Sequence, residues 1–352
     1  MWPWQAQLEL APAQAAAITA LAAPGDAFPR AGWRALGASG ALADVRPGAL
    51  VPAATALLAA DRLGPVLAWV LQGLILRQYL AGAAPPVAEV AAAVRAGEAL
   101  VAVAASEPGV GAHPGRLQTR AQRRADGAWE LSGRKGVVSL GLTADWLLVL
   151  AIVGEQDGHR RFALFCLPAN APGLTRRQVA GPPLLAPADH AELTLAQCVV
   201  PAWACLHPAG DALPAARAFR WLETGLLQAA GAAALLGPVA PLLAAGTAGR
   251  AACLRAALRV QGALQVWADA AETELRAPAA GAALLAADLE LAAAAAALQA
   301  ALKGTAAEVP TFRLAGAPGY TAASAALAMA ARGGERREAK LRTLLQDAGS
   351  DN

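Results

Sequence analysis

Two places in the 352-residue sequence carry side chains that could do chemistry. The first is the segment SEPGVGAH at residues 106–113, where a hydroxyl and a carboxylate stand beside Gly109 and Gly111. Glycines let backbone N–H groups approach a ligand closely, although the same residues also suit a plain tight loop. The second is Glu223, the only carboxylate between residues 212 and 243. A lone carboxylate in an apolar helix is unusual, and its plain interpretation is an exposed or ion-paired residue of that helix.

The segment 106–113 lies in the one region where alternating polar and apolar residues replace a background of Ala and Leu. Short strand-like runs recur there, and Asp-Gly turns at 126–127 and 157–158 are typical of β-hairpins. No long helical pattern separates the runs, so we expect a central antiparallel β domain at residues 99–205. The expected strands are residues 117–123, 129–132, 146–153, 162–167 and 192–200.

Both flanks of this region have helical patterns. Residues 53–80 carry apolar side chains at helical spacing, which predicts an N-terminal helical domain at residues 1–98. Four long helical segments follow residue 214, which predicts a C-terminal four-helix bundle domain at residues 206–352. The expected fold class is therefore mainly α with a central antiparallel β domain. The four expected helices are residues 215–243, 251–275, 279–302 and 320–345.

The composition argues against several classes of protein. Hydrophobic residues make up 57% of the chain, but Ala inflates that figure. The longest apolar run, residues 225–246, has the length of a bilayer span, yet it contains Gln228, Pro238 and Pro241. A buried helix of a soluble bundle explains the run better, so we expect no membrane span. No basic segment followed by an apolar one marks the N-terminus as a secretory signal.

The charged residues and the cysteines give no sign of a nucleic-acid or metal site. The net charge is +3, and the basic residues are scattered without interleaved aromatics, so we expect no nucleic-acid partner. The four cysteines lack CxxC spacing and have no pair of histidines nearby, so we expect no bound metal. Reduced, buried thiols are typical of a cytoplasmic protein, which is the location that we expect.

Motifs in the central region resemble those of the acyl-CoA dehydrogenase family. SEPGVGAH at residues 106–113 resembles the family's Thr-Glu-Pro-x-x-Gly-Ser-Asp, and SGRKGVVS at residues 132–139 is similar to its Asn-Gly-x-Lys-x-Trp-Ile-Thr/Ser. Ala-Asp-Trp at residues 144–146 and Val-Pro at residues 200–201 match further family marks. The order and spacing of these motifs agree with the family over nearly the whole chain. The order of the three expected domains is that of the family as well.

The resemblance implies a fold and a chemistry. Members of the family bind FAD between the β domain and the bundle, and an acyl-CoA thioester stacks on the flavin. A glutamate removes the α-proton while the β-hydride passes to flavin N5. The protein supplies a positioned carboxylate and orientation, and the cofactor supplies the acceptor. The resemblance also implies an acyl-CoA or acyl-carrier thioester as the substrate, and a homodimer or homotetramer assembled through the bundle.

Six residues would lie at the cofactor if the family roles carry over, and one of them is Val137, at the position of the aromatic that packs on the flavin. Ser106 keeps a hydroxyl near the flavin ring, although it could equally be a serine of the turn. Gly111 lies in the glycine loop, and Ser139 keeps the hydroxyl near flavin N5. Arg250 aligns with an arginine that reaches the pyrophosphate on a neighbouring subunit, although it could also be a surface arginine. Gln261 keeps the family spacing from Arg250.

The sequence departs from the family at positions that should hold the flavin or do the chemistry. Ala112 removes a hydroxyl, Val137 replaces a stacking aromatic, and Cys253 stands within the arginine motif. The position of the catalytic glutamate holds Gln346, whose amide cannot accept a proton. The adjacent Asp347 would project about 100° away around a helix.

Two functions are therefore open at the level of the sequence. In the first, the protein is a flavin-dependent acyl-CoA dehydrogenase with Glu223 as the base, because some branches of the family place the base within one residue of that position. In the second, the protein is a degenerate member with weak or no FAD binding. It would then act as a non-catalytic partner subunit or bind another ligand.

Overall fold

The computed structural model describes most of the chain. The described residues are 9–22, 25, 27–60, 62–181, 183–208, 212–245, 249–276, 282–307 and 320–331. The backbone forms two compact units. Unit 1 comprises Met1–Ala22, Asp44–Val70 and Arg220–Asn352, and unit 2 comprises Ala23–Ala43 and Leu71–Phe219. Helices α5 and α7 each run from one unit into the other, and the boundaries expected at 98/99 and 205/206 stay predictions.

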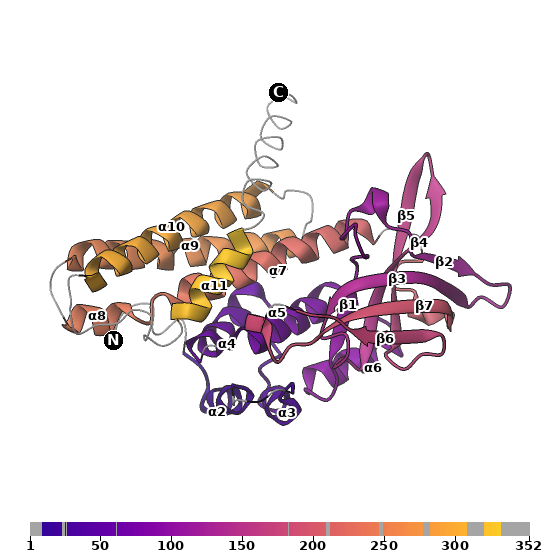
Figure 1. The fold of residues 1–352 in the computed structure, drawn as a ribbon, viewed down its shortest axis with the longest axis horizontal. Coiled ribbons are helices and arrows are strands. Elements are labelled where there is room, and N and C mark those ends of the chain that lie inside the picture. The colour runs from indigo at the N-terminus through magenta and orange to yellow at the C-terminus, as the bar shows by residue number, and fades with distance from the viewer. Residues whose placement is uncertain are drawn as a thin grey trace. The chain divides into compact units, whose positions relative to one another are not determined.

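Unit 2 is built around one seven-stranded sheet (Figure 1). The strand order is β1-β4-β2-β3-β7-β6, and β5 pairs with β4. All seven strands lie inside the region expected to form the β domain. They are β1 (Val101–Ala104), β2 (Arg120–Arg123), β3 (Trp129–Ser139), β4 (Trp146–Gln156), β5 (His159–Pro168), β6 (Leu174–Gln178) and β7 (His190–Val200).

The sheet is mixed rather than purely antiparallel. The pairs β2–β3, β3–β7, β4–β5 and β6–β7 are antiparallel as expected. Strand β1, however, runs parallel to β4 from Val101↔Trp146 to Ala104↔Val149, and β2 meets β4 in parallel at Arg120↔Ile152. Asp-Gly turns dictate only the local hairpins, whereas β1 reaches β4 through a long connection that permits a parallel pairing.

Buried hydrogen bonds fix helix α5 on the sheet of unit 2, and two glycines let two other helices of the unit pack closely on each other. The amide of Gln72 in α5 (Leu63–Gln78) donates to the Val101 carbonyl at 2.8 Å and accepts from the Val101 N–H at 2.9 Å. Helix α3 (Arg30–Ala38) packs closely on the end of α6 (Val87–Arg95), because Gly37 and Gly97 face each other there. A Cβ on Gly37 would lie 2.3 Å from the carbonyl carbon of Ala96.

We therefore expect Gly37→Ala to lower the free energy of unfolding by about 1–3 kcal/mol, because a backbone cannot move aside as a flexible side chain can. Urea denaturation measures the effect. Gly154→Ala is the matched control in the same unit, since a Cβ there would meet no atom within 4 Å. An equal loss in the two variants would contradict the close approach of α3 and α6.

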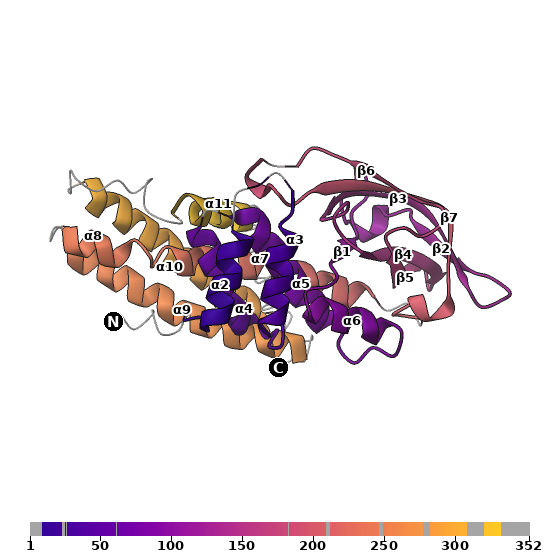
Figure 2. The ribbon, with the colours of Figure 1, turned by 90° about the horizontal axis from the view of Figure 1, so that it is seen from below.

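Unit 1 is helical. Its long helices α9 and α10 lie side by side (Figure 2). Asp288 of α10 is buried between them and accepts a hydrogen bond from the Trp267 indole N–H at 2.7 Å. Besides the parts of α5 and α7, the unit contains α2 (Pro12–Leu21), α4 (Pro47–Ala59), α8 (Val239–Ala245), α9 (Arg250–Arg276), α10 (Ala282–Ala307) and α11 (Tyr320–Ala331).

The C-terminal helices occupy the expected segments with one difference. The sequence predicts one helix over residues 215–243, but the structure has α7 (Leu213–Ala234) followed by turns and then α8. Pro238 explains the break, because proline lacks the N–H that would continue the helix. The last expected helix begins as predicted at Tyr320, while Gln346 lies outside the described residues.

Two helical stretches are long and apolar enough to cross a membrane by length and composition alone. They are Leu213–Ala244 and Ala282–Ala307. In the most apolar window of each, 83% and 44% of the residues are buried inside the chain. Core helices of a bundle show the same burial, so this is weak evidence for a span. The absence of a span, expected from the sequence, stays a prediction.

Candidate functional site

The loop at residues 106–111 is tight and exposes its backbone. The Glu107 N–H donates to the Gly111 carbonyl at 2.9 Å, and the Gly111 N–H donates back to Glu107 at 3.0 Å. Gly109 and Gly111 have φ angles of 76° and 62°, a left-handed conformation that glycine adopts without strain. A Cβ on either glycine would meet no atom within 4 Å. The loop is therefore tight and also open to an approaching ligand.

The loop is joined to a β-bulge on strand β3. The Gly136 N–H donates to the carbonyl of Ser106 at 3.0 Å. The register shifts between Lys135 and Val138, so Gly136 and Val137 together stand opposite one residue of β7. Bulges are over-represented next to active sites because they redirect a side chain.

The bulge presents Val137 to solvent in a strained conformation. Val137 has a φ of 55°, which is unusual for a β-branched residue and costs about 1–3 kcal/mol. It is 64% exposed, the most of any exposed large hydrophobic residue in the described part of the chain. Ser139 lies two residues further along β3 and is partly exposed. The structure thus places four of the sequence-predicted cofactor residues, Ser106, Gly111, Val137 and Ser139, on one loop and the strand joined to it.

A buried ion pair lies beneath this bulge. Lys135 is fully buried, and its Nζ lies 3.1 Å from Glu107 Oε1 and 3.2 Å from the Ala105 carbonyl. The Glu107 carboxylate also accepts the N–H groups of Gln118 at 2.7 Å and Thr119 at 2.9 Å. The pair therefore ties the loop to the strand that carries Val137.

Burial and pairing act in opposite directions on the two charges of this pair. Burial lowers the pKa of Lys135 to about 8, against the opposing effect of Glu107. Burial raises the pKa of Glu107, but hydrogen bonds from Thr119 and Gln118 and the charge of Lys135 together hold that pKa below its ordinary value. The pair is ionised at neutral pH.

Sequence reasoning missed this pair, although a signal was present. Lys135 has the same parity in β3 as the buried Leu131, so strand alternation places its side chain on the inward face. Buried lysines need a partner. Glu107, inside the motif at 106–113, is one of the carboxylates that the sequence offers as that partner.

Charged side chains also hold the turn that follows Ser139. The Asp189 carboxylate accepts the N–H groups of Leu142 at 2.6 Å and Thr143 at 3.0 Å. On the other side, the Arg176 guanidinium donates to three carbonyls of the same turn, those of Gly141, Leu142 and Ala144. Because Asp189 accepts its N–H groups and Arg176 donates to its carbonyls, the turn is held in place, and it fixes the end of strand β3.

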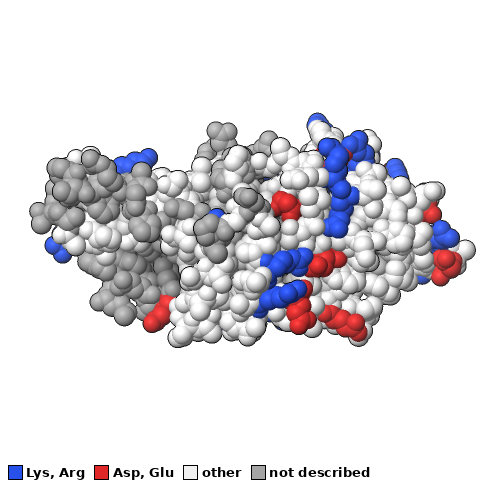
Figure 3. Space-filling view, turned by 60° about the horizontal axis from the view of Figure 1, so that its bottom comes forward, with Lys and Arg blue, Asp and Glu red and all other residues white. Residues whose placement is uncertain are grey.

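Two further ion pairs lie beside the bulge at the surface. Glu192, the residue of β7 opposite the bulge, forms ion pairs with Arg134 of β3 and Arg177 of β6. Elsewhere on the face shown in Figure 3, basic and acidic side chains occur in small groups, and much of the described surface carries neither. The absence of a nucleic-acid partner stays a prediction.

Glu223 lies in unit 1, on helix α7, and is partly buried. Burial raises the pKa of its carboxyl, and Arg220, one turn earlier, partly opposes that effect. A carboxylate with a raised pKa is suited to take up a proton near neutral pH. The role of Glu223 as the base stays a prediction, and its alternative is an ion-paired or exposed position of the helix.

The remaining predicted cofactor residues share one side of helix α9. Arg250, the first residue of α9, is exposed, and Gln261 is partly buried. Eleven residues correspond to about three turns of an α-helix, so the two side chains project in nearly the same direction. They lie in unit 1, whereas the loop and the bulge lie in unit 2.

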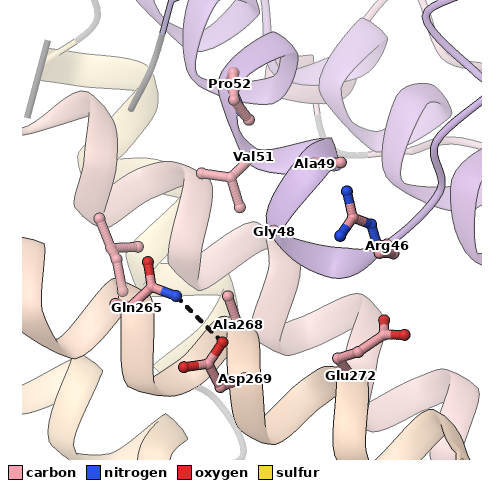
Figure 4. A pocket seen from close by; sticks show the side chains of 10 residues that line it. Arg46, Gly48, Ala49, Val51, Pro52, Gln265, Ala268, Asp269 and Glu272 are labelled. Atoms are coloured by element: carbon pink, nitrogen blue, oxygen red, sulfur yellow. Dashed lines mark hydrogen bonds between the residues drawn. The ribbon is translucent and has the colours of Figure 1, made fainter. Parts of the chain in front are cut away.

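Unit 1 also has a hollow of about 370 Å³ between the start of α4 and helix α9 (Figure 4). Arg46, which is ion-paired with Asp44, lines one side of it. Gln265 and Asp269 of α9 line the other, and the Gln265 amide donates to Asp269 Oδ1 at 3.2 Å. None of the sequence-predicted site residues lines this hollow. Among the described residues, no group of three or more His, Cys, Asp or Glu could hold a metal ion.

Comparisons with known proteins agree with the motifs. Residues 102–198 match the acyl-CoA dehydrogenase middle domain. The acyl-CoA dehydrogenase of Mycobacterium tuberculosis named FadE10 is 39% identical over 79 residues, which are 22% of this chain and 12% of FadE10. The chain thus matches about one eighth of the length of that curated relative.

Solved structures share the fold over almost the whole chain. The FAD complex of PigA has a TM-score of 0.72 at 14% identity and covers 98% of this chain and 99% of its own. The acyl-CoA dehydrogenase from Geobacillus kaustophilus has a TM-score of 0.67 at 19% identity and covers 91% and 90%. Butyryl-CoA dehydrogenase from Megasphaera elsdenii has a TM-score of 0.61 at 16% identity and covers 96% and 99%.

At these identities the structural likeness shows the fold, which is that of the acyl-CoA dehydrogenases. The middle-domain match covers the sheet together with the loop and the bulge. Residues 102–198 thus match that family's middle domain, and the whole chain has the family's fold.

Proposed function

We propose that the protein is a flavin-dependent oxidoreductase that binds FAD and dehydrogenates an acyl thioester between its α and β carbons. The match of residues 102–198 to the acyl-CoA dehydrogenase middle domain supports the class of reaction. Among the structures that share the fold, PigA is in complex with FAD, another is named an FAD-dependent dehydrogenase, and a glutaryl-CoA dehydrogenase is in complex with FADH2. An acyl-CoA or acyl-carrier thioester is the substrate that this class of reaction requires.

The observation that carries the proposal is the bulge at Val137 beside the glycine loop. A planar ring with polar edges needs an apolar surface on one side and hydrogen-bonding groups around it. Val137 supplies exposed apolar surface, and Ser106 and Ser139 supply hydroxyls nearby. The space beside Gly109 and Gly111 is open, so a ligand can approach the backbone of the loop. The residues present therefore fit the ring of FAD. The family places the arginine that aligns with Arg250 at the pyrophosphate of a neighbouring subunit's cofactor, and Gln261 keeps the family spacing from Arg250.

When bound, FAD supplies a two-electron acceptor, and the remaining chemistry falls to the chain. Glu223 takes the α-proton of the thioester onto a carboxylate oxygen. The raised pKa of its carboxyl favours this uptake. Gln346 cannot take this part, because an amide is not a base near neutral pH.

The second candidate is a protein with this fold that has lost the dehydrogenase activity. The observation that favours it is Val137, which stands where an aromatic side chain would stack on the flavin. Without an aromatic at this position the ring loses a stacking partner, and Ala112 removes a nearby hydroxyl. Such a protein would bind FAD weakly and serve as a non-catalytic partner subunit or a ligand-binding protein. It would still have the same fold and the same buried pair.

The visible absorption spectrum of the purified protein tests the choice. We expect flavin absorption bands whose intensity corresponds to about one FAD per chain. These bands should bleach when an acyl-CoA is added under anaerobic conditions. Protein reconstituted with excess FAD and then desalted is the control for loss during purification. Protein that stays colourless after reconstitution would overturn the proposal in favour of the degenerate member. Stable flavin without bleaching by acyl-CoAs of short, medium and long chains would overturn the substrate class.

We also propose a cytoplasmic location, from the reduced state of the cysteines. Cys166, Cys198, Cys205 and Cys253 are all free and buried. Burial raises the pKa of the Cys166 thiol to about 12, which keeps it protonated and unreactive. We propose a homo-oligomer as the assembly, as in the family.

A further inference from the structure

His190 stands directly opposite Ser139 in the pairing of β7 with β3. Residues that face each other in an antiparallel pair have their side chains on the same side of the sheet, with Cβ atoms about 4.5–5.5 Å apart. The imidazole and the hydroxyl are therefore neighbours. His190 is only 4% exposed, whereas Ser139 is partly exposed, so a ligand that reaches the hydroxyl has little access to the imidazole.

The segment that follows β6 holds the imidazole in one orientation. The Val179 N–H donates to the carbonyl of His190 at 2.9 Å, which continues the pairing with β7 past the end of β6. A Cβ on Gly181 would lie 2.4 Å from Nδ1 and 2.9 Å from Cε1 of the ring, so the ring edge with these atoms faces Gly181. Ser139 lies on the other side of β7, on β3. The ring edge that carries Nε2 is therefore the one turned toward Ser139.

Burial and a backbone contact decide which ring nitrogen carries a proton. Burial lowers the pKa of His190, against the opposing effects of the Asp189 charge and a hydrogen bond to the backbone of Ala188, so the ring is neutral near pH 7. A neutral imidazole has one N–H and one bare nitrogen. Nδ1 is the nitrogen nearer to the backbone, so it is the one suited to donate to the Ala188 carbonyl two residues back. Nε2 is then bare and able to accept a hydrogen bond.

We propose that His190 positions the Ser139 hydroxyl by accepting its hydrogen on Nε2. A hydroxyl has one O–H donor and two acceptor lone pairs. With the donor engaged by His190, only the lone pairs of Ser139 face a ligand. Ser139 then accepts a hydrogen bond from the ligand and cannot donate one. His190 is thus a positioning residue, because it touches no ligand and acts through Ser139.

The backbone on both sides of Ser139 supports a fixed hydroxyl. Leu140, the next residue, has a φ of 61° and is fully buried, and its N–H donates to the Asp189 carbonyl at 2.8 Å. Val137, two residues earlier, is left-handed as well. Such conformations of residues other than glycine persist only where the surroundings over-determine them. Ser139 therefore has little freedom to turn away from His190.

This direction of hydrogen bonding distinguishes the two redox states of a flavin, a consequence that rests on the proposed function. The resemblance to the family places flavin N5 at Ser139. In the oxidised ring N5 is a bare acceptor, whereas in the reduced ring it carries a hydrogen and is a donor. A hydroxyl that only accepts pairs with the reduced ring alone. We therefore expect His190 to make the site bind reduced FAD more tightly, which raises the midpoint potential of the bound flavin.

Nitrogen NMR of the imidazoles tests the hydrogen bond without any cofactor. The chain has four histidines, and the signals of His190 are those missing from His190→Gln. We expect a neutral ring with its proton on Nδ1 near neutral pH, and an Nε2 signal that shifts in Ser139→Ala. Thr194→Val is the matched control, because it removes an exposed hydroxyl from the same side of β7. A proton on Nε2, or an Nε2 signal that Ser139→Ala leaves in place, would overturn the proposal.

The midpoint potential of the bound FAD tests the consequence. His190→Phe frees Ser139 to donate to the oxidised ring, so the preference for reduced FAD should fall about tenfold, a drop of about 30 mV for a two-electron couple. His190→Gln offers an amide oxygen as the acceptor and should stay closer to the parent. In a Ser139→Ala background, His190→Phe should change nothing further.

Two results of the potential measurement would overturn the proposal. One is an unchanged potential in His190→Phe, and the other is an equal drop when Ser139 is already alanine. A chain that binds no FAD would contradict the proposed function instead, and the nitrogen signals would then decide the role of His190 by themselves.

Discussion

Replacing Glu107 with alanine is expected to lower the free energy of unfolding by about 3–5 kcal/mol, because it leaves the charge of Lys135 buried without its partner. The substitution also removes the acceptor for two backbone N–H groups, those of Gln118 and Thr119. Lys135 has no exposed surface, so water cannot take the place of the carboxylate. Urea denaturation followed by circular dichroism measures the loss.

The matched control removes both charges and keeps the shape. In Glu107→Gln/Lys135→Met, the amide oxygen still accepts from Thr119, and the methionine fills the space of the lysine stem. Replacing a buried ion pair by groups of similar volume is often neutral or stabilising. We therefore expect the double variant to recover most of the stability lost by Glu107→Ala. An equal loss in the two variants would show that the ion pair is not what the loop depends on.

The pH dependence of stability tests the same pair with a defined sign. The pKa of Lys135 falls from 10.5 to about 8 in the folded chain, so the unfolded chain binds this proton more tightly between those values. Stability attributable to Lys135 therefore rises as the pH increases through that window. The rise should be missing from the double variant, which lacks the lysine, so it should appear in the difference between the parent and the double variant. The pKa of Glu107 is also lowered in the folded chain, so its contribution has the same sign in an acidic window: the stability it adds is lost as the pH falls through the folded value.

The fold was predictable where local chemistry decides it. The Asp-Gly turns at 126–127 and 157–158 lead into the hairpins β2–β3 and β4–β5 as expected, because the turn geometry is set by adjacent residues. The parallel pairing of β1 with β4 was not predictable, because no local pattern encodes which distant strand a lone strand joins. The break before α8 followed from Pro238, which the sequence reading treated only as an argument against a membrane span.

The candidate site was predictable in its residues but not in its physical character. The motifs identified Ser106, Gly111 and Ser139, and the structure places all three on one loop and the adjoining strand. That Val137 is strained and exposed depends on a register shift between two strands, which only the folded backbone reveals. The buried pair beneath it joins residues 28 apart, a separation too large for a local pattern.

These features together suggest how the chain keeps a strained residue at its site. Val137 costs about 1–3 kcal/mol in its left-handed conformation, so the surroundings must fix it. Lys135 and Glu107 fix it from the inner side, and the ion pairs of Glu192 with Arg134 and Arg177 lie across the bulge. The strain is an observation that motivates a function, because a solvent-exposed valine at a bulge serves no packing role in the chain.

The largest effect on activity is expected from Glu223→Gln. The amide has the shape of the carboxylate but cannot accept the α-proton, so the rate of flavin bleaching by an acyl-CoA should fall by about 10²–10⁴-fold, the contribution typical of a general base. FAD content and the affinity for acyl-CoA should be unchanged, since the variant keeps the volume and hydrogen-bonding capacity of the side chain. Stopped-flow absorbance under anaerobic conditions measures the rate. Glu290→Gln makes the same chemical change at an exposed position of α10 and should bleach as fast as the parent.

The pH profile of bleaching separates a base from a residue that only supports the fold. Burial raises the pKa of Glu223, and a base works only when deprotonated, so the rate should fall with decreasing pH at a value above the ordinary pKa of a glutamate. Arg220 lowers that pKa, so Arg220→Ala should move the acid limb of the profile to higher pH without abolishing activity at alkaline pH. Bleaching of Glu223→Gln at the parental rate, or an acid limb that Arg220→Ala leaves in place, would remove Glu223 from the chemistry. The proton would then have to go to a base on another segment of the chain.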